Sequence, residues 1–424
     1  MCKSNDTVGS PYQQRGVALL ALLTLLSLFG LYLFVGQLSA TQFQMAREEK
    51  SAAALAEARQ ALIDEAVTRP AVNDAGYLHL PDLGSQLVFG SWVPAEGGAS
   101  QSFLGNYQDF SVIGKFPWKA LYTGPLRDAT GQCLWYVVSG RLKIVPKTDA
   151  LNWDTLGQID VINANGAFLA VNLAALLVSP GPALDGQSRA LADAAYAECG
   201  GNYDARNYLD AFDGTNALAG QVNYYADSTN NRVASDSNNK QFVMVERYPH
   251  YNDRFTFLTV DQIFDPLIRR SDFRDAIGNL LGDATFRAHL QTIVVAGNKG
   301  TDNLDCRCNK DPCGPPVSPP DPPSVRQFQD FCENWKEMLF LTRVTPPITI
   351  NGASHTCNRV LIFAGRRTAG QSRSTSIEKA NPANYLEGAN ATSFHVPTAS
   401  ATDFAGASVF NWRTPATDLL RCLP

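Results

Sequence analysis

The sequence predicts an α+β fold in which a long N-terminal transmembrane and amphipathic α-helix precedes a β-rich extracytoplasmic part with a duplicated sheet motif. An uncharged apolar run occupies residues 17–36. Strong helix formers without Gly or Pro continue from Thr41 to Arg69. After Pro70, short apolar or aromatic runs alternate with Gly, Pro, Asn and Asp, a pattern typical of strands. Strands mixed with helices indicate the α+β class.

The composition is that of a folded protein with room for one or two hydrophobic cores. The chain has 424 residues, of which 45% are hydrophobic and 18% are charged, and its formal net charge is -5. This mildly acidic balance gives no electrostatic footprint for DNA or RNA, so we expect no nucleic-acid partner.

The apolar run is long enough to cross a bilayer. About twenty residues at roughly 1.5 Å each span about 30 Å, the thickness of the hydrocarbon layer. Lys3 and Arg15 precede the run, which predicts that the short N-terminus stays inside. A signal peptide cut near residues 37–40 is the alternative, but the run is longer than a typical signal core.

The amphipathic stretch continues the same helix. Leu55, Ala58 and Leu62 fall on one face at helical spacing, and Pro70 ends the pattern. The sequence therefore predicts one continuous helix over residues 17–69, of which residues 17–36 are transmembrane.

The start of this helix resembles the prepilin cleavage region of type IV pilins and type II secretion pseudopilins. Residues 13–20 read QQRGVALL. In that family a short basic leader ends in Gly, a prepilin peptidase cuts after it, and the new first residue is methylated. The resemblance implies a leader over residues 1–16, cleavage after Gly16 and N-methylation of Val17. Major pilins mostly have Phe first and Glu fifth, whereas this chain has Val17 and Ala21, as some tip pseudopilins and minor pilins do.

Further stretches are similar to large pilin-like proteins of Gram-negative bacteria. They are ALAEARQALI at 54–63, GYLHLPD at 76–82, FPWKAL at 116–121 and LRDATGQCLWY at 126–136. The resemblance implies a structural minor pilin or pseudopilin, single-pass in the inner membrane with a periplasmic C-terminal part, and at the cell surface once assembled. Its implied partners are other pilin or pseudopilin subunits, bound through the N-terminal helix, and prepilin peptidase.

The part after Pro70 contains an internal repeat. The paired anchors, in the same order in both copies, are WK at 118 and 335, an Asn-Gly turn at 165 and 351, an apolar strand at 176 and 360, GQSR at 186 and 370, and Asn-Tyr-Leu-acid at 207 and 384. The predicted organisation is a β-rich module over residues 70–300 with helices near 261–290, a Cys/Pro-rich connector over 301–323, and a shorter β-rich module over 324–424.

The cysteines favour disulfides. Cys2 precedes the apolar run, and the remaining cysteines form an even set, as full pairing requires. The candidates are Cys133, Cys199, Cys306, Cys308, Cys313, Cys332, Cys357 and Cys422. A zinc site at the cluster around Cys308, completed by His355 and Cys357, is the alternative, but C-x-C is tighter than the usual zinc spacing.

An oxygen-rich loop surrounds Gly214. Asp204, Asp210, Asp213 and Asn216 are its possible calcium ligands. The loop lacks the D-x-[DN]-x-[DN]-G spacing, so a solvated loop is favoured over a calcium site and we expect no cofactor.

No catalytic motif is recognisable. Ser188 and Ser372 lie in the two GQSR stretches, but neither forms a G-x-S-x-G elbow, and the five histidines form no known triad or H-E-x-x-H pattern. The sequence therefore indicates a structural protein rather than an enzyme. Two alternatives stay open: a membrane-anchored periplasmic binding or scaffolding protein that forms no filament, and a periplasmic hydrolase.

Overall fold

A computed structural model describes residues 12–72, 74–88, 91–100, 110–145, 147, 151–189, 198–200, 202–214, 217–225, 239–245, 250–292, 331–395 and 402–424. The chain divides into two compact units, Met1–Ala53 and Ala54–Pro424. The predicted leader residues before Tyr12 and the predicted connector over 301–323 lie outside the described residues.

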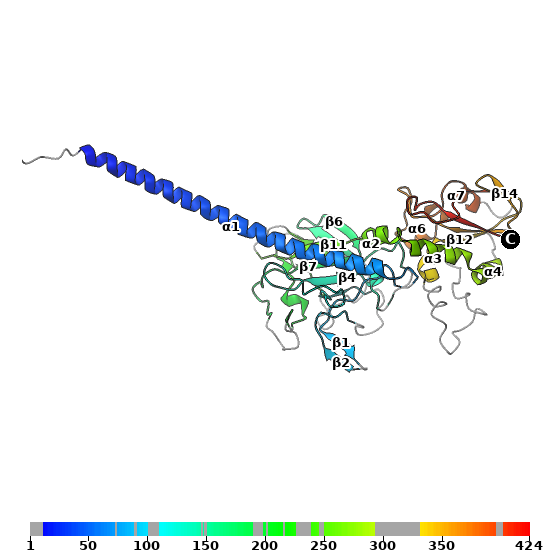
Figure 1. The fold of residues 1–424 in the computed structure, drawn as a ribbon, viewed down its shortest axis with the longest axis horizontal. Coiled ribbons are helices and arrows are strands. Elements are labelled where there is room, and N and C mark those ends of the chain that lie inside the picture. The colour runs from blue at the N-terminus through cyan, green and yellow to red at the C-terminus, as the bar shows by residue number, and fades with distance from the viewer. Residues whose placement is uncertain are drawn as a thin grey trace, which may run out of the picture. The chain divides into compact units, whose positions relative to one another are not determined.

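Helix α1 runs from Tyr12 to Thr68, so it begins in the first unit and ends in the second (Figure 1). It ends two residues before Pro70, whose ring and missing N–H cannot continue a helix. The absence of Gly and Pro between Thr41 and Arg69 explains why no break occurs earlier in that stretch.

The prediction of a transmembrane segment over residues 17–36 is wrong. Within the part of the chain that the structure describes, no helix combines the length and the apolarity that crossing a membrane requires. For the same reason, two further predictions are wrong: the single-pass inner-membrane location and the transmembrane part of the fold class. The prediction rested on the absence of charge over residues 17–36, and absence of charge alone does not supply the length and apolarity that a bilayer requires.

The last turns of α1 bury one face in the core of the second unit. Their buried side chains recur at helical spacing and are Ala54, Leu55, Ala58, Leu62 and Ala66. They belong to the same hydrophobic cluster as Tyr136, Val138 and Leu177, which lie on the strands beneath α1 (Figure 1).

The first copy of the repeat begins with an antiparallel sheet in the order β11-β7-β4-β3. Its strands are β3 Val112–Lys115, β4 Trp135–Val138, β7 Ala175–Ser179 and β11 Arg254–Leu258. Successive side chains of a strand point to opposite faces. Tyr136 and Val138 therefore join the cluster that contains α1, whereas Trp135 and Val137 join a second cluster on the other face.

The second cluster is closed by a three-stranded sheet in the order β10-β5-β6. Its strands are β5 Ile159–Asn163, β6 Phe168–Leu173 and β10 Lys240–Met244. Strand β6 pairs antiparallel with β5, and β10 pairs parallel with β5. The first copy is thus a sandwich of two sheets, with the last turns of α1 packed on its outer face.

The second copy has the same strand arrangement. An antiparallel sheet, β12-β15-β17, consists of β12 Leu339–Arg343, β15 Arg359–Phe363 and β17 Leu419–Leu423. A second sheet, β14-β13-β16, consists of β13 Ile348–Ile350, β14 Ala353–His355 and β16 Asp403–Phe404. Again the hairpin is antiparallel and the third strand is parallel to its neighbour.

The topology relates β4 to β12, β5 to β13, β6 to β14, β7 to β15, β10 to β16 and β11 to β17. The turns Asn163–Gly166 and Asn351–Gly352 therefore occupy equivalent hairpins. The WK anchor does not fit this relation, because Trp118 lies well before β4 whereas Trp335 lies just before β12.

Three helices follow β11, where the sequence predicts helices near 261–290. They are α2 Val260–Leu267, α3 Ser271–Gly282 and α4 Ala284–Thr292. Thr259 and Gln262 form a capping box that starts α2. The remaining short elements are β1 Ser85–Val88, β2 Ser91–Pro94, β8 Ala211–Phe212, β9 Gln221–Val222, α6 Ser376–Lys379, α7 Gly388–His395 and the 3₁₀ turns η1 Gly140–Leu142, η3 Ala205–Asn207, η6 Lys336–Met338 and η7 Pro382–Asn384.

An aromatic cluster joins the two copies. Trp153, which precedes β5, lies 4.6 Å from Trp335 in edge contact, centroid to centroid. Trp335 lies 5.2 Å from Phe273 of α3 and 6.0 Å from Phe363 of β15. The rings come from both copies and from the helices between them, so the copies share one hydrophobic core.

Replacement of Trp335 by Ala tests this shared core. Trp335 is buried, and loss of a buried Trp typically costs about 3–5 kcal/mol of unfolding free energy. The matched control is Trp412→Ala, because Trp412 is exposed and its replacement should cost about 1 kcal/mol or less. Urea denaturation of both variants measures the difference, and similar losses would refute a shared core centred on Trp335.

Candidate functional site

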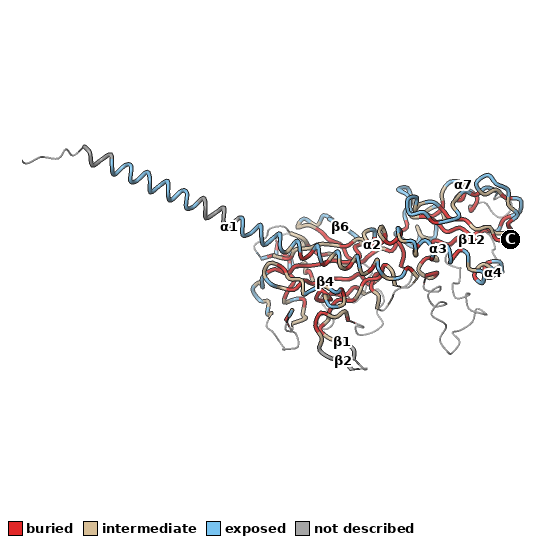
Figure 2. Tube along the Cα trace, viewed as in Figure 1, coloured by how far each residue is buried: buried red, intermediate tan, exposed pale blue. Residues whose placement is uncertain are grey.

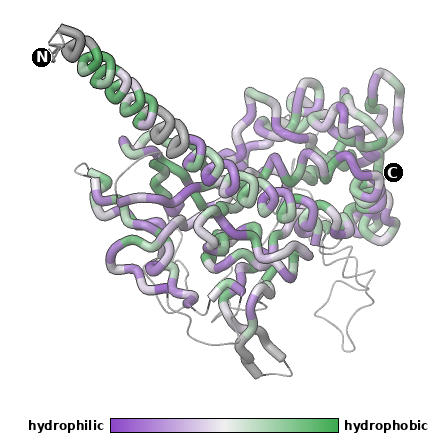
Figure 3. Tube along the Cα trace, turned by 60° about the vertical axis from the view of Figure 1, so that its left-hand side comes forward, coloured by the Kyte–Doolittle hydropathy of each residue, from purple (hydrophilic) through white to green (hydrophobic). Residues whose placement is uncertain are grey.

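The first unit exposes apolar side chains around α1. Those between residues 17 and 33 range from 49% exposed at Leu33 to 75% at Tyr32. Figure 2 colours this part of α1 as exposed, and Figure 3 colours most of it as hydrophobic. They are Val17, Leu19, Leu20, Leu22, Leu23, Leu25, Leu26, Leu28, Phe29, Leu31, Tyr32 and Leu33. They occupy nearly every position, so apolar surface covers all sides of the helix rather than one stripe.

The hydroxyl groups of Thr24 and Ser27 in this segment are hydrogen-bonded within the helix. The hydroxyl of Thr24 donates to the carbonyl oxygen of Ala21 at 2.9 Å, and that of Ser27 donates to Leu23 at 2.8 Å. Because both hydroxyls are bonded to the helix backbone, another apolar surface can cover the segment without stranding a polar group.

The predicted processing residues, Gly16 and Val17, are consecutive residues of α1. Val17 is 69% exposed. Cleavage after Gly16 and methylation of Val17 stay predictions.

Two disulfides have both of their cysteines among the described residues. They join Cys133 to Cys199 and Cys357 to Cys422. Cys332 is disulfide-bonded as well. The other candidates, Cys306, Cys308 and Cys313, lie outside the described residues. Since Cys357 is bound to another sulfur, it is not a free thiolate for the alternative zinc site.

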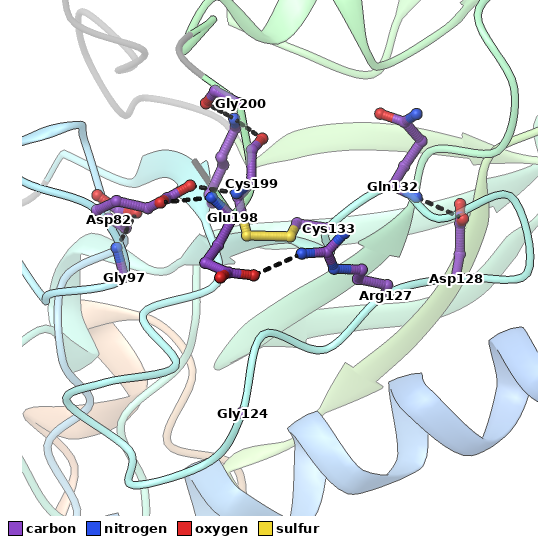
Figure 4. The surroundings of a disulfide bond; sticks show 12 residues. Asp82, Gly97, Gly124, Arg127, Asp128, Gln132, Cys133, Glu198, Cys199 and Gly200 are labelled. Atoms are coloured by element: carbon purple, nitrogen blue, oxygen red, sulfur yellow. Dashed lines mark hydrogen bonds and ion pairs between the residues drawn. A yellow bond between two sulfur atoms is a disulfide. The ribbon is translucent and has the colours of Figure 1, made fainter. Parts of the chain in front are cut away.

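A polar network surrounds the first disulfide (Figure 4). Arg127 pairs with Glu198 at 2.8 Å, and the amide of Glu198 donates to Glu96 at 3.0 Å. The ammonium of Lys115 donates to the carbonyl oxygens of Cys199 and Gly200 at 2.5 and 2.6 Å. Burial lowers the pKa of Lys115 to about 8. The lysine ties the disulfide-bearing segment to β3, which is a structural role.

Asp82 is the acidic counterpart of Lys115. Its carboxylate accepts from the amide of Gly97 at 2.7 Å (Figure 4). It also accepts from the amide of Gly84 and from the hydroxyl of Tyr203, both at 2.9 Å. Burial nevertheless raises the pKa of Asp82 to about 6. All these partners belong to the chain itself, so the network holds loops together.

The first GQSR stretch forms a bonded cluster with the Asn-Tyr-Leu-acid stretch. The amide nitrogen of Gln187 donates to Asp210 at 3.3 Å. Arg189 donates to the carbonyl oxygens of Asn207 and Gly181, both at 2.7 Å. Gly181 follows β7, and Asn207 ends η3, so Arg189 connects a strand end to a 3₁₀ turn.

The second copy repeats these bonds. Gln371 donates to Glu387 at 2.9 Å. Arg373 donates to the carbonyl oxygen of Asn384 at 2.6 Å and to that of Gly365 at 3.2 Å. Gly365 follows β15 and Asn384 ends η7. Each guanidinium also stacks on the Tyr of its motif, at 4.8 Å in the first copy and 4.2 Å in the second.

Each cluster contains a second acid, immediately before the next strand of the antiparallel sheet. In the first copy, the amide of Asp210 donates to the carboxylate of Asp253 at 2.9 Å, and the amide of Asp253 donates to that of Asp210 at 3.1 Å. In the second copy, the carboxylate of Asp418 accepts from the amide of Gly365 at 3.1 Å and from the side chain of Asn390 at 2.8 Å, and the charge of Asp418 acts on Glu387. Asp253 precedes β11 and Asp418 precedes β17.

Burial shifts the pKa of all four acids upward. Burial and then the charge of Asp210 raise the pKa of Asp253 well above its ordinary value, and burial raises that of Asp210. Burial and then the charge of Asp418 raise the pKa of Glu387 to about 7. Burial also raises the pKa of Asp418. Two carboxyl groups this close resist double ionisation, so each pair favours holding a proton.

The two clusters differ in one ion pair. Arg373 also binds Asp154, with 2.7 Å between nitrogen and oxygen and with both side chains at most 1% exposed. Asp154 lies between β4 and β5 of the first copy, so this bond links the copies. Arg189 is only half-buried.

The possible calcium ligands that the structure describes do not form one site. Asp204 caps η3 and accepts from Arg206, Asp210 faces Asp253, and Asp213 is exposed. Asn216 lies outside the described residues. Across the described ranges, no group of three or more His, Cys, Asp or Glu is arranged to hold a metal ion.

The serines of the two GQSR stretches, which would be the nucleophiles of a hydrolase, lie at the surface. Ser188 and Ser372 are both exposed. The amide of Ser188 donates to the side chain of Asn207 at 3.0 Å. This contact fits a turn.

Sequence reasoning found GQSR and Asn-Tyr-Leu-acid but missed their long-range partners Asp253, Asp418 and Asp154. The available signal was an acid directly before an apolar strand in both copies. That signal becomes informative only when the repeat is extended to the last strand of each sheet.

No family profile, curated protein or solved structure matches the chain. The resemblance to pilins and pseudopilins therefore rests only on the sequence stretches quoted above.

Replacement of Arg373 by Met should destabilise the protein strongly. The change leaves Asp154 charged and buried without its partner, a situation that typically costs about 3–5 kcal/mol. The matched control is Arg189→Met in the first copy, where the bonds go mainly to carbonyl oxygens and the expected loss is about 1–2 kcal/mol. Urea denaturation measures both values, and an equal loss would contradict the special role of the Arg373–Asp154 pair.

Proposed function

We propose that this protein is a structural subunit of the minor-pilin or pseudopilin type, which assembles with other subunits through the apolar segment of α1. The observation that carries the proposal is the exposed apolar surface between Val17 and Leu33. A helix that is apolar on all sides is normally buried. Burial of a Leu or Phe side chain contributes about 1.5–3 kcal/mol, so packing against other such helices provides a large driving force for assembly.

The arrangement of the chain supports this proposal. The second unit has its own core and disulfides, whereas the apolar segment belongs to the first unit. Disulfides suit a protein that works in oxidising surroundings. Val17 and Ala21 stand where major pilins mostly have Phe and Glu, which favours a minor position in the filament, at its tip or within its shaft.

The polar clusters of the second unit support a non-catalytic role. Arg373, Lys115 and Asp82 are buried, and their bonds go to other groups of the chain. Such groups position backbone segments, and this is the work that a rigid structural domain requires.

Mass spectrometry of the mature N-terminus tests the processing step. We expect a chain that begins at Val17 and carries one methyl group, because the leader resembles that of prepilins. The variant Gly16→Val should remain uncut when expressed with a prepilin peptidase. An intact Met1, or a start near Thr41, in the unmodified protein would contradict a pilin-type subunit.

Introduction of a charge tests assembly through the helix. Leu26 is 60% exposed, so Leu26→Asp should leave the second unit folded. Among packed apolar helices, however, an unpaired carboxylate costs several kcal/mol, on the order of a hundredfold or more in assembly. The measurement is the sedimenting fraction of the protein in cells that make filaments, with Leu26→Ile as the apolar control. Normal assembly of the Asp variant would refute packing at this segment.

A further inference from the structure

We propose that Arg269, Trp412 and Arg413 form a docking surface for an acidic segment of a partner protein. Carboxylate groups of the partner bind the two guanidinium groups, and its apolar side chains cover the exposed part of the indole. The proposal concerns the second unit only and does not depend on assembly through α1.

The indole of Trp412 gathers two cations from distant parts of the chain. The guanidinium carbon of Arg413 lies over the ring, 4.4 Å from its centroid, and that of Arg269 lies 5.4 Å from it. Trp412 and Arg413 belong to the loop between β16 and β17, whereas Arg269 belongs to the turn between α2 and α3. The electron-rich face of an indole attracts cations, so the ring holds both side chains at one place.

The loop that carries Trp412 is anchored to the core. Phe410 is 5% exposed and stacks on Trp153, with 6.2 Å between the ring centroids. The amide of Arg413 donates to the side-chain oxygen of Asn411 at 3.0 Å, which fixes the turn around Trp412. Because the loop is already ordered, binding of a partner does not have to order it, and this lowers the entropic cost of association.

The guanidinium groups of this surface lack acidic partners. Among the residues that the structure describes, Arg269 and Arg413 take part in no ion pair, whereas Arg270, Arg274 and Arg366 are each bound to an aspartate. Arg269 and Arg413 are both exposed. A guanidinium that lies over a ring still presents N–H donors at its edge, and a carboxylate accepts two of them in parallel. The surface is therefore suited to carboxylate groups.

Apolar surface next to these cations favours a protein segment over a small anion. Trp412 is 37% exposed, and Val409, earlier in the same loop, is 60% exposed. Trp and Arg are among the residues that most often dominate the binding energy of protein interfaces. An inorganic anion uses the charges alone and leaves the indole and Val409 in water. A segment that carries both acidic and apolar side chains uses the whole surface.

The charge of the whole chain makes this surface selective. The formal net charge is -5, so on balance the molecule repels an acidic segment. Two arginines without acidic partners in such a chain direct the segment to one place. The same net charge gives no general attraction to nucleic acid, so an acidic protein segment is the polyanion that fits.

Binding of a fluorescent peptide of repeated Glu-Leu-Glu units to the full-length protein tests the proposal. Fluorescence anisotropy should show that Arg269→Gln and Arg413→Gln each weaken binding about tenfold or more, because each removes a charged donor for the peptide. Trp412→Ala should weaken it as well, since it removes the apolar contact and the ring that holds the two arginines. Both arginines are exposed, so their variants should keep the urea denaturation midpoint of the unmodified protein.

A matched control separates this surface from the overall charge. Arg206→Gln removes the same charge from an exposed arginine of the first copy, which is paired with Asp204, and should leave the affinity within about twofold. An equal loss in Arg206→Gln, or no loss in Arg269→Gln and Arg413→Gln, would overturn the proposal. Vesicles of phosphatidylglycerol that bind through the same arginines while the peptide does not would also overturn it, because the partner would then be a lipid surface.

Discussion

The buried ion pair between Arg373 and Asp154 is the constraint on which the second unit depends. Each partner comes from a different copy of the repeat, and both are removed from water. A buried charge tolerates only a narrow geometry, since its desolvation is offset only while its partner stays in place. Trp153 directly precedes Asp154 in the sequence, Trp335 lies just before β12, and the two rings are in edge contact. Apolar burial and charge pairing therefore stabilise the same junction between the copies.

The repeated clusters show how one sequence motif serves two purposes. In both copies, Gln and Arg of GQSR connect a strand end to a 3₁₀ turn, and the acid directly before the last strand accepts from a backbone amide. Only the second copy extends its arginine to the other copy. The half-buried Arg189 binds groups of its own copy, whereas the fully buried Arg373 also binds Asp154 of the other copy.

Much of the second unit could be predicted from local sequence pattern. The predictions that were wrong have identifiable causes. Pro70 predicts the end of α1 because its ring stops a helix, and GQSR predicts a repeated turn because the same letters recur in order. The pairing of Trp118 with Trp335 was wrong because two identical letters carry no information about strand order. The prediction of a transmembrane segment was wrong because an uncharged run was taken as sufficiently long and apolar.

The sequence by itself determined the helical run of α1, the strand-forming segments and the repeat, because propensity, periodicity and turn residues act between neighbours along the chain. Only the tertiary structure decided that Asp253 and Asp418 complete the acid pairs, that Arg373 reaches Asp154, and that Cys133 joins Cys199. These contacts link residues tens to hundreds of positions apart. Their energies depend on burial and on the distances between donors and acceptors. Neither property can be predicted from local sequence, because both are set by the tertiary structure.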